Sequence, residues 1–110
     1  MNFIKEPAAE KELIDAAAFY DRQGPGLGDR FIDELERVIV LLLEHPELGV
    51  RVGKDRRVIV LKRFPFRLVY AVEDSGIRII AVAHQKRRPG FWRGRIAEPR
   101  PMYAILPRAA

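Results

Sequence analysis

The spacing of the apolar residues changes near Arg56, and this change is the strongest constraint on the fold. Before it, apolar residues recur at intervals of three and four, which places them on one face of a helix. After it, Phe66–Glu73 shows a period of two, which is typical of a strand. A chain that carries both periods in this order is expected to be an α+β protein, with its helices packed on one face of a sheet.

Two helices are predicted before the change, joined by a short turn. The first begins at Glu6-Pro7, because proline suits the first turn of a helix, and ends near Gln23-Gly24. The second begins at Pro25 and ends around His45-Pro46. The apolar face of the first contains Ala9, Leu13, Ala16, Ala17 and Tyr20, and that of the second contains Phe31, Ile32, Leu35, Val38, Ile39 and Leu42.

The remaining surface of both helices is expected to be polar. The first helix carries Glu10, Glu12, Asp15 and Asp21 there, and the second carries Asp29, Arg30, Asp33, Glu34, Glu36 and Arg37. In the second helix this polar face disappears over Val38–Leu43. That run indicates either a helix end buried on all sides or an exposed apolar patch for a partner.

Four strands are predicted around this helical hairpin. A short strand at Phe3-Ile4 precedes it, and Val58–Leu61, Phe66–Glu73 and Ile77–His84 follow it. Tight connections make the last three strands an antiparallel meander, so the order is β-α-α-β-β-β. Alternation places Phe66, Leu68, Tyr70 and Val72 on one face of their strand, and Arg78, Ile80, Val82 and His84 on one face of theirs.

The chain is predicted to end in an extended arm. Residues 1–95 form one domain, and Ile96–Ala110, which holds three prolines, forms a C-terminal extension with at most one short strand at Met102–Leu106. The chain has no cysteine, and His45 and His84 are far apart, so no metal site and no cofactor are expected. The N-terminus lacks the pattern of a secretory signal, and the longest apolar run is too short to span a bilayer. We therefore expect a cytoplasmic protein without a membrane partner.

The two halves of the chain differ in charge. Residues 1–55 contain 7 Lys and Arg against 12 Asp and Glu, a net charge of −5, whereas residues 56–110 contain 13 against 3, a net charge of +10. Such a separation indicates an acidic partner for the second half, either a phosphate backbone or an acidic protein segment.

Three features together resemble the RelE/ParE superfamily of toxins from bacterial type II toxin–antitoxin modules. They are the helical hairpin, the segment Phe64–Val72 (FPFRLVYAV) and the ending Ala83–Trp92 (AHQKRRPGFW), and the likeness covers about residues 1–93. The resemblance implies a small α+β toxin that is held inactive by a cognate antitoxin. The antitoxin would wrap the toxin with a disordered acidic or amphipathic segment that orders on binding.

The resemblance implies two alternative activities. RelE-like members cleave mRNA in the ribosomal A site, and ParE-like members inhibit DNA gyrase. In a RelE-like enzyme, Arg67 matches the strand arginine that contacts the scissile phosphate, Arg87 or Arg88 falls near a second arginine, and Lys62 adds charge. The tyrosine that such enzymes place after the second arginine is absent, since Phe91 and Trp92 stand there and neither transfers a proton.

Two other tyrosines are poor substitutes for the missing one. Tyr70 shares a strand with Arg67 but points to the opposite face, and Tyr103 lies on the remote arm. We therefore favour the ParE-like, gyrase-directed activity without a catalytic site over the ribosome-dependent endonuclease.

The predicted target-binding surface combines cations with two aromatic residues. Its members are Arg63, Arg67, His84, Lys86, Arg87, Arg88, Phe91 and Trp92. Each also has a structural interpretation: Arg67 could pair with a helix carboxylate, His84 could be a hydrogen-bonded strand end, and Trp92 could close the edge of the core. The cluster Lys86-Arg87-Arg88 could be a solvated charge run.

Two further classes of function compete with a toxin. A basic nucleic-acid-binding module would use arginine and aromatic side chains for phosphates and bases. It would show binding that is steeply weakened by salt, without toxicity. A purely structural or interaction protein would also be non-toxic.

Overall fold

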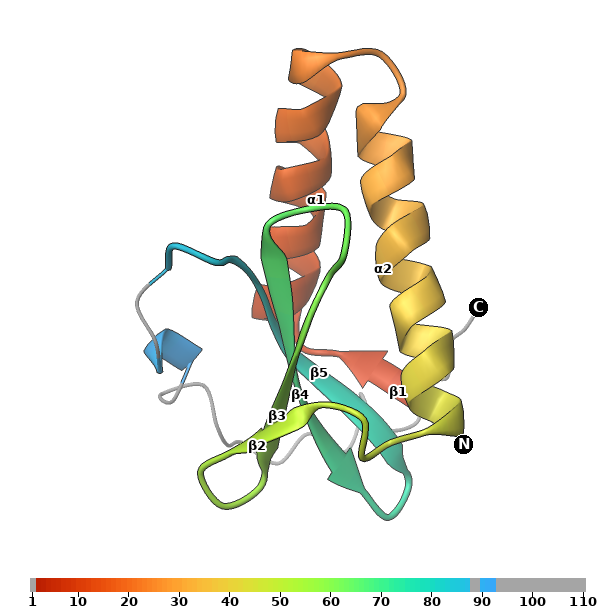
Figure 1. Ribbon diagram of the computed structural model, residues 1–110, viewed down its shortest axis with the longest axis vertical. Coiled ribbons are helices and arrows are strands. Elements are labelled where there is room, and N and C mark those ends of the chain that lie inside the picture. Colours follow the sequence, from red (N-terminus) through yellow and green to blue (C-terminus); the bar gives the residue numbers. More distant parts are fainter. Residues whose placement is uncertain (1, 88–89, 93–110) are drawn as a thin grey trace.

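The chain forms a helical hairpin packed on one face of a five-stranded sheet. The computed structural model describes residues 2–87 and 90–92 (Figure 1). The elements are β1 (Asn2–Lys5), α1 (Pro7–Gln23), α2 (Leu27–Glu44), β2 (Val50–Val52), β3 (Arg56–Val60), β4 (Phe66–Glu73) and β5 (Gly76–His84). The predicted α+β class is confirmed, and β2 is an additional strand. The expected extension at residues 96–110 and its short strand lie outside the described residues.

The hairpin turn depends on two glycines and one aspartate. α2 begins at Leu27 rather than at Pro25, because Gly26 precedes it in a left-handed conformation with φ 83° that favours glycine. The Asp21 carboxylate on α1 accepts the N–H of Gly28 at 2.9 Å, which satisfies one of the first donors of α2. A side chain at Gly28 would have no room, because a Cβ atom there would lie 2.5 Å from the carbonyl oxygen of Ala17.

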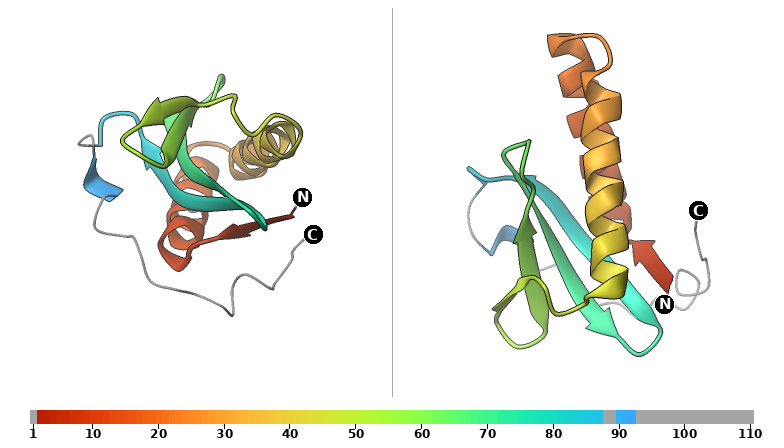
Figure 2. Two further views of the ribbon diagram at one scale, coloured as in Figure 1. Left: turned by 90° about the horizontal axis from the view of Figure 1, so that it is seen from below. Right: turned by 45° about the vertical axis from the view of Figure 1, so that its right-hand side comes forward.

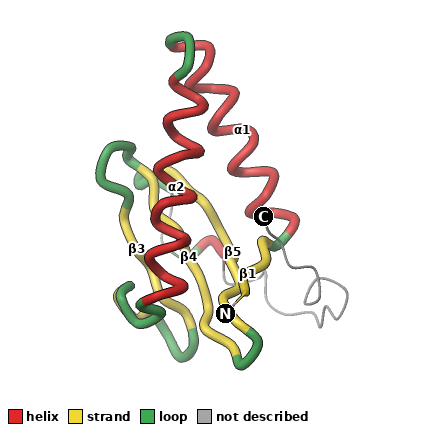
Figure 3. Tube along the Cα trace, turned by 90° about the vertical axis from the view of Figure 1, so that its right-hand side faces the viewer, coloured by secondary structure: helices red, strands yellow, loops and turns green. Residues whose placement is uncertain are grey.

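The sheet has the order β1-β5-β4-β3-β2 and is mixed. β3, β4 and β5 form the predicted antiparallel meander, but β1 pairs with β5 in parallel. The helical hairpin joins β1 to the rest of the sheet (Figure 3). The chain then forms β2 at the opposite edge and returns through β3 and β4 to β5 beside β1. β2 was not predicted, because it has only three residues. A weak signal was present, since Val50 and Val52 alternate around Arg51 before a turn at Gly53.

A β-bulge corrects the predicted face of β5. Val69 pairs with Ala81, but the next residue, Tyr70, pairs with Ile79, so Ile80 is an extra residue in β5. The alternation therefore changes phase at Ile80, and the prediction that Arg78, Ile80, Val82 and His84 share one face is wrong. Val82 packs under the helices, whereas Ile80 packs on the opposite face of the sheet.

The sheet has an apolar core on each face. The larger core lies between the hairpin and the sheet, where Phe31, Leu35 and Leu42 of α2 meet Leu68 and Tyr70 of β4. The smaller core lies on the other face, and a short helical turn containing Phe91 and Trp92 covers it (Figure 2). The members of this second core include Val69, Ala71, Ile80, Ala81 and Trp92.

The apolar run at the end of α2 is mostly buried, but not completely. Val38, Ile39 and Leu42 are buried in the main core, so most of the run serves packing. Val40, however, is 56% exposed and faces away from the sheet. The helix end is therefore not buried on all sides.

We predict that Gly28→Ala destabilises the fold although alanine is the better helix former. The new methyl group would collide with the α1 backbone and push the two helices apart, so the free energy of unfolding should fall by about 1–3 kcal/mol. Urea unfolding followed by circular dichroism measures this change. Gly24→Ala is the matched control, because its Cβ would meet only the flexible side chain of Leu27, and it should shift stability by no more than about 0.5 kcal/mol. Equal effects of the two substitutions would contradict the steric explanation.

Candidate functional site

Two loops at one end of the sheet bring most of the predicted site residues together. The first loop joins β3 to β4, and the second follows β5. The N–H of Gln85 donates to the carbonyl oxygen of Pro65 at 2.8 Å, which ties the loops to each other. We call this surface the cationic corner, and its described members are Lys62, Arg63, Arg67, His84, Lys86 and Arg87.

Arg67 and Arg87 lie side by side in this corner. Arg67 Nη2 donates to the backbone carbonyl oxygen of Arg87 at 2.8 Å. Strand alternation places Arg67 on the face of β4 away from the helices, whereas Tyr70 lies on the helix face, as predicted. The guanidinium of Arg67 therefore holds the start of the C-terminal segment by its backbone. The alternative that Arg67 pairs with a helix carboxylate is not what the structure shows.

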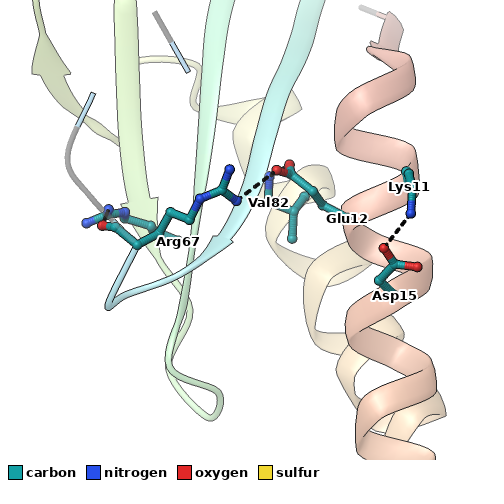
Figure 4. A network of polar contacts seen from close by, with 6 residues as sticks. Lys11, Glu12, Asp15, Arg67 and Val82 are labelled. Carbon is teal, nitrogen blue, oxygen red and sulfur yellow. Dashed lines mark hydrogen bonds and ion pairs between the residues drawn. The ribbon is translucent and has the colours of Figure 1, made fainter. Parts of the chain in front are cut away.

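Arg87 is the arginine that meets a helix carboxylate. Its Nη1 lies 3.4 Å from Glu12 Oε2 on α1, and its guanidinium carbon lies 3.9 Å from the centre of the Phe91 ring. The other oxygen of Glu12 accepts the N–H of Val82 on β5 at 2.9 Å (Figure 4). Arg87 is 47% exposed and is therefore accessible, whereas Glu12 is largely buried.

A second helix carboxylate holds the β3–β4 loop. Glu34 on α2 accepts the N–H of Lys62 at 3.1 Å and a hydrogen bond from Arg37 Nη2 at 3.1 Å. Burial raises the pKa of the Glu34 carboxyl. The hydrogen bonds from Arg37 and from the N–H groups of Lys62 and Arg63, together with the charge of Arg37, outweigh burial and lower the pKa below its ordinary value of 4.5. The side chains of Lys62 and Arg63 are exposed.

His84 has a structural contact on each side of its ring. Its Nδ1 accepts the N–H of Lys86 at 3.0 Å, and the ring packs edge-on against Phe66 with centroids 5.3 Å apart. The hydrogen-bonded strand end is thus the arrangement that the structure contains.

Trp92 is buried, unlike the exposed cations of the corner. It is 6% exposed and packs against Val69, Ala71 and Ile80 in the second core. The indole therefore closes the edge of a core, which was one of its two predicted roles. Phe91 is half-buried and stacks with Arg87. Arg88 and Tyr103 lie outside the described residues.

The two carboxylates that organise the corner were missed from the sequence. Glu12 and Glu34 were assigned to solvated polar faces, yet both reach backbone N–H groups of the sheet region. A signal for Glu34 was present, because it lies three residues after Phe31 and four before Val38, at the spacing of the buried face. Glu12 directly precedes the buried Leu13, which leaves its role ambiguous without the packed structure.

Residues 2–87 and 90–92 contain neither a metal-binding cluster nor a membrane-spanning helix. No group of three acidic, histidine or cysteine side chains there is arranged to hold a metal ion. Neither helix in this part of the chain is sufficiently long and apolar to cross a membrane.

Comparison with known proteins finds a matching family model and similar solved structures. Residues 4–89 match the family model for the ParE toxin of the parDE type II toxin–antitoxin system. A solved structure of the chromosomal ParDE toxin–antitoxin system from P. aeruginosa is similar with a TM-score of 0.67 and 18% identity, over 76% of this chain and 95% of that one. The isolated E. coli RelE toxin is similar with a TM-score of 0.53 and 22% identity, over 84% of this chain and 93% of that one. No curated protein sequence gives a significant match.

We predict that acid weakens the fold partly through Glu34. Its pKa is lowered in the folded protein, so its stabilising contribution is complete above about pH 4.5 and is lost as the pH falls through the folded value. In Glu34→Gln this part of the pH dependence should disappear, because an amide does not titrate. Urea unfolding at a series of pH values from neutral to acid measures it. Glu36→Gln, on an exposed position of the same helix, should retain the wild-type dependence. Parallel curves for wild type and Glu34→Gln would contradict this role.

Proposed function

The chain belongs to the ParE toxin family of type II toxin–antitoxin systems, and on that premise we propose that it arrests bacterial growth by inhibiting DNA gyrase through the cationic corner. The observation that carries the proposal is the contact between Arg67 and the backbone of Arg87, which gathers separate cations on one accessible surface. Such a surface suits an acidic target and accelerates its association.

The chemistry of the corner supports inhibition by binding rather than RNA cleavage. Cleavage through the 2′-hydroxyl needs groups that accept and donate protons. Arginine does not titrate near neutral pH, and Tyr70 is buried on the helix face. The Tyr70 hydroxyl donates to Pro46 and accepts the N–H of Gly49, each at 2.8 Å, so it anchors the loop before β2. Among the described corner residues, His84 is the single imidazole, and its Nδ1 already accepts a hydrogen bond from the N–H of Lys86.

Ribosome-dependent mRNA cleavage is the second candidate function. The adjacency of Arg67 and Arg87 favours it, because two neighbouring guanidinium groups can bind a scissile phosphate. The fold similarity to the E. coli RelE toxin is consistent with it. In this alternative Lys62, Arg67 and Arg87 would be the catalytic cations, and His84 the nearest candidate for proton transfer. A plain nucleic-acid-binding module would need only the charge.

The antitoxin is proposed to dock on the free edge of the sheet at β2 as well as beside the helices. β2 is an edge strand, so its outer backbone groups can pair with an added strand. Val50 is 72% exposed, and Leu48 and Val60 are also exposed, which provides an apolar surface along this edge. Arg51 and Lys54 make the same edge cationic. An acidic, partly apolar segment complements it, whereas a second copy of this chain would be repelled.

We predict that Arg67→Ala abolishes most of the inhibition of gyrase supercoiling, raising the concentration needed by about tenfold or more. Purified toxin is assayed in parallel for gyrase inhibition and for A-site mRNA cleavage, and the gene is induced in a bacterium with and without its antitoxin. Growth arrest that the antitoxin relieves, with gyrase inhibited and mRNA intact, is the expected result. Cleaved mRNA with active gyrase would select the RelE-like alternative, and unaffected growth with salt-sensitive DNA binding would select the binding module.

Arg51→Ala is the matched control for this substitution. Arg51 Nη2 also donates to a backbone carbonyl oxygen, that of Lys54 at 2.9 Å, but it lies on the edge strand β2 rather than on the central strand β4. It should inhibit gyrase as the wild type does. Fluorescence of Trp92, the single tryptophan, reports whether the segment held by Arg67 stays packed. Wild-type inhibition by Arg67→Ala would rule out the cationic corner as the gyrase-binding surface.

We predict that Val50→Lys weakens antitoxin binding by about tenfold, equivalent to ~1.4 kcal/mol, because it removes an exposed apolar contact at the centre of the edge. Isothermal titration of the toxin with its antitoxin measures this change. Val40→Lys is the control, since that valine is also exposed but lies on α2. Antitoxin binding that is weakened by Val40→Lys and not by Val50→Lys would place the interface on the hairpin alone.

A further inference from the structure

The contacts of the Glu12 carboxylate with Val82 and with Arg87 differ in strength. Oε1 accepts the N–H of Val82 at 2.9 Å, a hydrogen bond of ordinary length in a partly buried place. β1 pairs with β5 only as far as Ile79, so beyond that residue α1 takes the place of a neighbouring strand. Glu12 is 17% exposed. If its carboxylate moved away, the N–H of Val82 would lose its acceptor in a partly buried place, which is costly. The carboxylate is therefore a fixed part of the fold.

The contact between Glu12 and Arg87 is much easier to break. The distance from Oε2 to Arg87 Nη1 is 3.4 Å, longer than the 2.7–2.9 Å that is typical of charge-assisted hydrogen bonds. Arg87 is 47% exposed, and exposed ion pairs contribute little to stability. The guanidinium can exchange Glu12 for another anion while Glu12 keeps its bond to Val82. Arg67 meanwhile holds the backbone of Arg87 in place.

Because of these contacts, Glu12 competes with any anionic ligand for the guanidinium of Arg87. We propose that Glu12 acts as a built-in counter-ion, which partly neutralises Arg87 in the free protein and is displaced from it by a phosphodiester group of single-stranded nucleic acid. The inference rests on the proposed function only in taking the cationic corner as the target-facing surface. A phosphodiester has two free oxygens at a spacing that a guanidinium can bind, as a carboxylate does.

The surroundings of Arg87 favour a phosphate polymer over an acidic peptide. Among the described residues, five Lys and Arg side chains lie in the two adjoining loops and the start of β4, which suits a ligand with a charge on every unit. The stacking of Arg87 on Phe91 presents the flat combination of guanidinium and ring that single-stranded nucleic acids bind. Figure 4 shows the carboxylate of Glu12 directed at the sheet from α1, whereas Asp15 on the same helix faces Lys11.

The test compares Glu12→Gln with Asp15→Asn in the full chain. Glutamine keeps an oxygen for the N–H of Val82 but loses the charge that opposes the ligand. The affinity for a fluorescent twelve-nucleotide single-stranded DNA, measured by anisotropy, should rise about three- to fivefold at low salt in Glu12→Gln. The slope of log K against log salt should steepen by about 0.7, because one more cation is available to a phosphate. Asp15→Asn changes the net charge equally but removes a carboxylate paired with Lys11 at 2.8 Å, and it should change the affinity little.

A double variant and a stability control provide further tests of the proposal. In an Arg87→Gln background, Glu12→Gln should no longer raise the affinity, since the cation that Glu12 neutralises is gone. Thermal unfolding checks that Glu12→Gln keeps the wild-type stability, and in Glu12→Ala the N–H of Val82 loses its acceptor and stability should fall. Equal gains from Glu12→Gln and Asp15→Asn would reduce the effect to net charge and overturn the proposal.

Poly-glutamate serves as the competing anion. Stronger binding of poly-glutamate than of the DNA, with the same dependence on Glu12, would overturn the choice of a phosphodiester. The assay contains no gyrase and no ribosome. A toxin that fails to inhibit gyrase could therefore still show the Glu12 effect, and a gyrase inhibitor could lack it, so the two failures are distinguishable.

Discussion

Burial of the hairpin's apolar faces against one side of the sheet is the contact on which every other part of this protein depends. Phe31 and Leu35 of α2 and Leu13 of α1 are buried against Leu68 and Tyr70 of β4 and their neighbours on β5. Each fully buried side chain of this kind contributes about 1.5–3 kcal/mol, and the contact fixes where both helices lie. Polar side chains on the flanks of the helices are then held at defined places over the end of the sheet.

Two of those flanking side chains give the hairpin a second role. Glu34 accepts a backbone N–H from the β3–β4 loop, so α2 holds that loop directly. Glu12 accepts a backbone N–H near the end of β5, so α1 holds the strand that leads into the second loop. The acidic half of the chain therefore scaffolds the basic half, as well as balancing its charge. The acidic and basic halves of the chain therefore meet in the folded protein. One such contact is the ion pair between Glu12 on α1 and the accessible Arg87 after β5.

The second core explains why the corner keeps its shape. Trp92 covers Val69, Ala71 and Ile80 on the face away from the helices. Its burial anchors the segment after β5 against this face of the sheet. Arg67 holds the same segment by the carbonyl oxygen of Arg87. Arg67, a proposed target-binding residue, is thus also part of the support for Arg87.

The sequence by itself determined the elements apart from β2, their order, and which loops carry the cations, because periodicity and turn residues are local properties of the chain. The helices, the meander and the loops bearing Lys62, Arg67 and Arg87 all follow from such patterns. Only the tertiary structure decided the phase of β5, the parallel pairing of β1 and the partners of Arg87. A bulge at Ile80 depends on which residues oppose it, and a carboxylate at Glu12 meets an arginine 75 positions away only after the helix has packed. These are long-range contacts, and no local pattern encodes them.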